Sequence, residues 1–204
     1  MFGGGTDGNE QLTATVGVIL LVLFAVLGVS IIRIGQLLWL HLFLGVILAV
    51  PVALKIGSAG YRFTRYYTAS PAYVRKGPPH PVLRVLGPVV ILTTVTVFLT
   101  GLLLLLDGPS APGTLRLLHK VSFFVWLAAF GVHVLGHLTE LPRSLRAVSH
   151  AKGRTRNLPG AGGRAVAIIG SLAAGLVLAL LFLPDIHTWT SAGGLHGFHH
   201  VHPH

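Results

Sequence analysis

The sequence predicts an all-α integral membrane protein, a helical bundle of five transmembrane helices in which four form a core and one is added. Three observations lead to this fold class. Hydrophobic residues make up 52% of the 204-residue chain, and its mean hydropathy is +0.77. Only 10% of the residues are charged, whereas a soluble domain carries about 25%. Several apolar runs also reach the roughly 20 residues that a helix needs to cross a bilayer.

The apolar runs are separated by turn-forming or basic segments. Pro51 should kink the second span, which neighbouring helices can tolerate, and the glycines at 57–60 should end it. The fifth span carries small residues suited to close helix packing. We expect residues 1–185 to form one transmembrane domain and residues 186–204 to form a His-rich tail. The expected spans are approximately residues 13–32, 37–56, 82–106, 115–138 and 165–183.

The distribution of basic residues predicts the orientation. Residues 57–84 hold five Lys or Arg and residues 139–164 hold six, whereas the opposite side holds only Arg33, Arg116 and Lys120. Cytoplasmic segments are enriched in Lys and Arg, so we expect a cytoplasmic N-terminus and a C-terminus outside.

Arginine outnumbers lysine 11 to 4, and Gly, Ala, Val and Leu are abundant. This composition is typical of a GC-rich bacterial genome, so we expect a multi-pass protein of the bacterial inner membrane.

The composition excludes several kinds of site. The chain has no cysteine, which excludes disulfides, thiolate-bound zinc, iron–sulfur clusters and cysteine-linked haem. The single methionine is Met1, so no methionine within the membrane can ligate a metal. The net charge of +10 does not indicate nucleic-acid binding, because the basic residues lie between apolar spans and set the topology.

The main candidate site consists of histidines within the spans, where ionisable residues are costly and mark functional positions. His41 and His119 each lie about four residues into a span that starts on the outer side, and therefore at a similar depth of roughly 6 Å. Two helices that present imidazoles at one level can ligate haem iron from opposite faces. We therefore expect these two histidines to hold b-type haem. The alternative is that both are interfacial histidines bonded to water or a carbonyl.

A second haem would need ligands nearer the inner side. His133 lies 14 residues after His119, on nearly the same helix face and roughly 21 Å further along. The matching position on the second span is Lys55, which could ligate iron, pair with a haem propionate or extend to the inner surface. The cofactor prediction is therefore one haem b, with a second left open. The other candidate ligands at the inner end are His80 and His137.

The His119–His133 spacing on one span, with His41 on a neighbouring span, resembles the membrane cytochrome b families. These include bacterial cytochrome b561 and the b-type subunits of formate dehydrogenase and nickel–iron hydrogenase. The resemblance covers the second to fourth spans, about 100 residues. It implies a helical bundle with bis-histidine haem that passes electrons between a quinone pool and a partner redox subunit. It also implies an electron-transfer subunit rather than a stand-alone enzyme.

The third span adds to this resemblance. Arg84 and the following Val-Leu-Gly, with Thr100 and Gly101 further on, are similar to the first haem helix of those families. In those families a histidine usually follows the arginine by three positions, where this chain has Gly87. Arg84 and Arg62 could bind haem propionates. The alternative is that they mark the cytoplasmic surface and bind anionic lipid.

Two other functions remain open. The chain could be a metal-ion transporter or channel that uses the histidine stripe, or a membrane anchor subunit without a cofactor. The tail favours the first of these, because six histidines lie between His187 and His204 and His-rich tracts bind copper, zinc or nickel. The tail could equally be unstructured.

Overall fold

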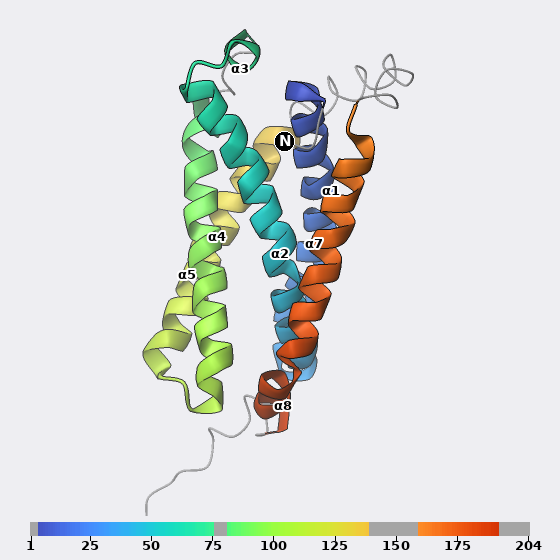
Figure 1. The fold of residues 1–204 in the computed structure, drawn as a ribbon. Coiled ribbons are helices and arrows are strands. Elements are labelled where there is room, and N and C mark those ends of the chain that lie inside the picture. Colours follow the sequence, from blue (N-terminus) through green and yellow to red (C-terminus); the bar gives the residue numbers. More distant parts are fainter. Residues whose placement is uncertain (1–3, 76–80, 139–158, 192–204) are drawn as a thin grey trace, which may run out of the picture.

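The computed structural model describes residues 4–75, 81–138 and 159–191, and these residues form helices joined by short turns (Figure 1). The all-α prediction is confirmed for this part of the chain. The elements are α1 (Gly5–Ile32), α2 (Ile34–Tyr67), α3 (Pro71–Arg75), α4 (Pro81–Asp107), the 3-10 helix η1 (Gly108–Ser110), α5 (Gly113–Leu138), α7 (Ala161–Leu181) and α8 (Leu183–Ser191).

Five of the described helices, α1, α2, α4, α5 and α7, are long and apolar enough to cross a membrane. They coincide with the five expected spans, so the prediction of a multi-pass helical bundle is confirmed. Large apolar side chains remain exposed along them, for example Val85, Ile169 and Leu181 at 70%, 67% and 71% exposure. Such apolar surfaces are stable against the hydrocarbon of a bilayer, so these helices contact lipid.

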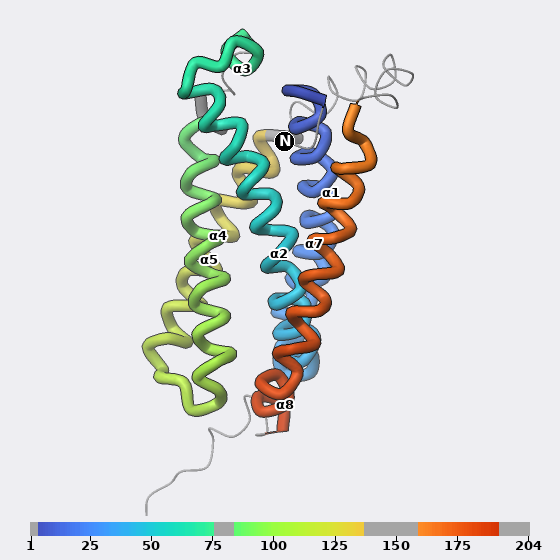
Figure 2. The backbone as a smooth tube through the Cα atoms, in the orientation of Figure 1, coloured from blue at the N-terminus to red at the C-terminus, as the bar shows by residue number. Residues whose placement is uncertain are grey.

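Successive spanning helices run in opposite directions (Figure 2). One end of the bundle, which we call the basic end, holds the N-terminus of α1, the end of α2, α3, and the start of α4 and α7. The opposite end, which we call the α8 end, holds the α1–α2 junction, the α4–α5 turn and α8.

The helices pack as two groups. In the first, α2 packs against α1 and α7, and in the second, α4 and α5 form a hairpin (Figure 1). Leu12 and Val16 of α1 pack with Leu48 of α2 in the main buried cluster. At Gly175 of α7, a Cβ atom would collide with the Ile47 carbonyl oxygen of α2, so only glycine permits this approach. By contrast, α2 packs only sparsely on α4.

One local expectation was wrong. The second span does not end at residues 57–60, because α2 continues to Tyr67; Ser58 is buried there and tied to α1 through the Asn9 side chain. The departure from helical dihedral angles inside α2 is at Leu37, and Pro51 lies buried within the helix. The helix α8 covers the first residues of the expected tail.

Candidate functional site

His41 on α2 and His119 on α5 both lie near the α8 end, seven and six residues after the first residue of their helices. Both side chains are half-buried. The structure therefore places both histidines at the same end of the bundle, on α2 and α5.

Each imidazole is hydrogen-bonded through Nδ1 to a hydroxyl on another helix. His41 Nδ1 lies 3.2 Å from Ser30 Oγ of α1, and His119 Nδ1 lies 2.9 Å from Thr100 Oγ1 of α4. Both hydroxyl-bearing residues are buried, at 0% and 4% exposure. The four helices α1, α2, α4 and α5 thus contribute one residue each to these two contacts.

The hydroxyl protons determine which ring nitrogen carries hydrogen. Ser30 Oγ donates to the Leu27 carbonyl at 2.6 Å, and Thr100 Oγ1 donates to the Thr96 carbonyl at 2.8 Å. A hydroxyl has one proton to donate, so each can offer Nδ1 only a lone pair. When the hydroxyls donate to these carbonyls, each imidazole carries its proton on Nδ1 and its Nε2 lone pair is available. This is the arrangement in which a second hydrogen bond fixes the tautomer of a metal-binding histidine.

Gly101 of α4 makes room for the His119 ring. A Cβ atom at this position would lie 3.1 Å from Cε1 of His119, closer than ordinary van der Waals contact. The absence of a side chain at Gly101 lets the ring lie directly against α4 while Thr100 holds its Nδ1.

An apolar cluster lies at the α8 end of the bundle. Ile186 and Trp189 of α8 are buried with Leu105 of α4, and Leu42 and Phe43, which follow His41, pack against this cluster. The Trp189 indole donates to the Leu104 and Leu105 carbonyls at 3.2 and 3.3 Å. These carbonyls belong to the last turn of α4, where no intrahelical donor remains. The contact therefore anchors α8 on the bundle.

On the other side of the site, an aromatic cluster fills the space between α1 and α5. Trp126 stacks on Phe130 with a centroid distance of 4.7 Å, and Phe24 packs on both rings at 5.1 and 5.6 Å. The Trp126 indole donates to Thr94 Oγ1 at 2.9 Å. His119, Phe123, Trp126, Phe130 and His133 follow one another at intervals of three and four residues, so they form one face of α5.

Lys55 is directed toward α1. Its ammonium donates to the Thr13 carbonyl at 2.5 Å, and it lies so close to Gly17 that a Cβ there would come within 2.9 Å of Nζ. It therefore does not extend to the basic end. His133 is half-buried on α5. The interactions of Lys55 provide no support for pairing with His133 around a second haem.

The other predicted site residues are at the basic end or outside the described part. Arg84 is exposed; its Nε donates to the Tyr67 hydroxyl at 2.6 Å, and its guanidinium lies 5.2 Å from the centre of that ring. Arg62 is half-buried near the end of α2. His137 lies in the last turn of α5, but its side chain is outside the described residues, as are His80 and the tail histidines after the exposed His187.

Within the described ranges, no group of three or more His, Cys, Asp or Glu side chains converges as a metal site. The His41–His119 pair is a different kind of arrangement, because two axial histidines suffice for a haem whose macrocycle supplies the remaining ligands. Sequence reasoning identified this pair but missed Ser30 and the role of Thr100 as its hydroxyl partners. Ser30 carries the one hydroxyl between residues 20 and 32, which was an available signal.

Comparison with protein-family models, curated proteins and solved structures found no match to this chain.

Proposed function

We propose that this protein is a membrane b-type cytochrome that passes electrons between a quinone pool and a partner redox subunit through haem b held by His41 and His119. The observation that carries this proposal is the matched pair of Nδ1–hydroxyl contacts, to Ser30 and Thr100. Two histidines of similar depth, each with Nε2 left available, match the needs of axial ligation.

The environment of the pair suits electron transfer. When bound, the haem supplies an iron centre that takes up and releases one electron. His41 and His119 would hold the haem through their imidazoles, and the hydroxyls would hold each ring in a fixed orientation. Ile186 and Trp189 are buried at the α8 end, and an apolar surrounding limits the reorganisation that accompanies a change of charge.

One haem is better supported than two. The Lys55 ammonium donates to α1, the aromatic cluster occupies the space next to His119 on α5, and Gly87 stands where the resembling families carry a histidine. His133 is then a half-buried histidine of the bundle rather than a ligand.

The proposed location is the bacterial inner membrane with the basic end in the cytoplasm. The Lys and Arg of residues 57–84 and 139–164 support this orientation, because the potential and the anionic lipids of the cytoplasmic leaflet retain positive charge. The haem would then lie nearer the outer side.

The test is a reduced-minus-oxidised visible spectrum of the purified protein, expressed with added haem precursor, with haem quantified as pyridine haemochrome. We expect a b-type spectrum and one haem per chain. His41→Ala and His119→Ala should each abolish it, whereas His133→Ala, the matched change on the same face of α5, should retain it. Circular dichroism and size exclusion should show that all variants are folded. A folded but colourless wild-type protein, or loss of haem in His133→Ala alone, would overturn the proposal.

A further inference from the structure

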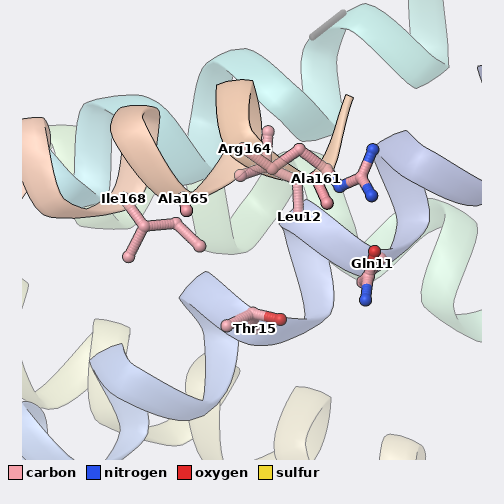
Figure 3. Close-up of a pocket in the computed structure, with 7 residues that line it drawn as sticks. All are labelled: Gln11, Leu12, Thr15, Ala161, Arg164, Ala165 and Ile168. Carbon is pink, nitrogen blue, oxygen red and sulfur yellow. The ribbon is translucent and has the colours of Figure 1, made fainter. Parts of the chain in front are cut away.

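The two helix groups of the bundle are each held together by their own contacts. In the first group, α2 packs closely on α1 and α7, and Leu12 of α1 and Ile168 of α7 line one shallow hollow where these helices meet (Figure 3). In the second group, α4 and α5 pack closely as a hairpin. His41 and His119 follow the same division, since each ring bonds a hydroxyl of its own group.

Between the groups, the described residues make fewer contacts, and α2 packs only sparsely on α4. In the middle of the bundle, Phe24 of α1 packs on Trp126 and Phe130 of α5. At the basic end, Arg84 of α4 donates to the Tyr67 hydroxyl of α2, but both side chains are exposed. Neither contact lies at the α8 end, where the two histidines are.

The helix α8 connects the two groups at that end (Figure 1). It follows α7 of the first group after a single residue. Trp189 donates to the Leu104 and Leu105 carbonyls of α4 at 3.2 and 3.3 Å, and the Arg116 guanidinium of α5 lies 5.7 Å from the centre of its ring. Leu42 of α2 packs against the same apolar cluster. One indole thus joins both helices of the second group to the first.

The attachment of α8 is small. Of its nine residues, Ile186 and Trp189 are buried, whereas His187, Thr188 and Ser191 are exposed. A segment with few buried apolar contacts opens at a lower free-energy cost than the core helices of the same protein. The contact that connects the groups near the histidines is therefore also one that can be released without unfolding the bundle.

We propose that α8 is a releasable strap that holds the two helix groups together at the end where His41 and His119 lie. With Trp189 docked, the groups keep a fixed separation. With α8 released, they part at this end, while the contact of Phe24 with α5 keeps them joined in the middle. The proposal goes beyond the proposed function, because it concerns the packing of the chain and needs no haem. Under the proposed function, release of α8 opens a path to the two imidazoles.

The first test measures how well α8 protects a thiol beneath it, in the full-length protein in lipid nanodiscs. The chain has no cysteine, so Leu105→Cys, at a position only 3% exposed, carries a single thiol. Its rate of reaction with a water-soluble methanethiosulfonate reagent reports the release of α8. Trp189→Phe keeps an aromatic ring but loses the indole donor, and we expect about tenfold faster reaction, the effect of one hydrogen bond.

Trp126→Phe is the matched control for this test. It removes an indole donor that bonds Thr94 within the second group at 2.9 Å, and it should leave the reaction rate of Leu105→Cys unchanged. All variants are made in the His41→Ala background, where bound haem cannot hold the groups together, and circular dichroism and size exclusion should show that they are folded.

A second measurement reports the separation of the groups. Spin labels at Ile32 and Leu117, which are 82% and 61% exposed, mark the first and second groups at the α8 end. Labels at Leu103 and Leu117 both lie in the second group. In double electron–electron resonance, Trp189→Ala should add a longer population to the Ile32–Leu117 distances and leave the Leu103–Leu117 distances unchanged.

Either of two results would overturn the proposal: equal reaction rates in Trp189→Phe and Trp126→Phe, or Ile32–Leu117 distances that Trp189→Ala leaves unchanged in folded protein. The haem content of the wild-type protein is measured separately. A wild-type protein without haem whose variants show both effects would refute the cytochrome and retain the strap. A haem-containing protein whose variants show neither effect would retain the cytochrome and refute the strap.

Discussion

The hydroxyl of Thr100 provides the sharpest test of how the site is built. In Thr100→Val the side chain keeps its shape but no longer accepts from His119 Nδ1, which is half-buried and lies 2.9 Å away. Leaving a buried donor without its acceptor costs about 1–3 kcal/mol, and less for a half-buried one; loss of such an outer-shell partner typically lowers metal affinity by about 10–100-fold.

Two measurements follow from this change. The rate of haem transfer to excess apomyoglobin should rise about tenfold, within the range for such partners. The midpoint potential should rise, because an imidazole without an Nδ1 acceptor donates less electron density and stabilises ferric iron less. Ser30→Ala should act in the same direction on His41 but more weakly, since the Ser30 contact is longer at 3.2 Å.

Thr96→Val is the control for this experiment. Its hydroxyl is exposed and bonds only the Leu92 carbonyl of its own helix. If Thr100→Val and Thr96→Val have the same haem-transfer rate and the same potential, the hydroxyl does not orient the ligand, and the reasoning about the tautomer fails.

Three further substitutions test other contacts. Gly101→Ala should displace the His119 ring, whose Cε1 would lie 3.1 Å from the new Cβ, and should broaden or diminish the haem absorption bands in the visible spectrum. Lys55→Met should keep the full haem content, because the ammonium bonds α1; loss of half the haem in the pyridine haemochrome assay would instead identify Lys55 as a ligand. Gly175→Ala should lower the midpoint of thermal unfolding, with a cost of about 1–3 kcal/mol from overpacking against an α2 carbonyl, whereas Gly170→Ala, where a Cβ meets nothing within 4 Å, should not.

The sequence was sufficient to predict the five spans and the level of the two central histidines. Both depend on properties of one helix at a time: an apolar run of bilayer length and the distance of a residue from the start of its span. This is why His41 and His119 could be paired without knowledge of the packing. The haem between them is still a prediction.

What the sequence did not reveal depends on contacts between helices. Ser30 is one hydroxyl in an apolar run, and its role follows only when α1 is placed against His41. The continuation of α2 beyond residue 60 depends on the contact between Asn9 and Ser58. This contact holds the chain helical where Gly57 and Gly60 would otherwise favour the end of a helix. The direction of Lys55 likewise depends on the space that Gly17 leaves on α1.

The contact between Lys55 and Thr13 has a consequence for biogenesis. The Lys55 ammonium finds its acceptor on α1, and the part of the chain that the structure describes offers it no carboxylate partner. An α2 segment released alone into the bilayer would carry this charge without its acceptor, which costs several kcal/mol. Since only Arg33 separates α1 from α2, the two segments can leave the insertion machinery as a preformed hairpin, with the lysine already satisfied.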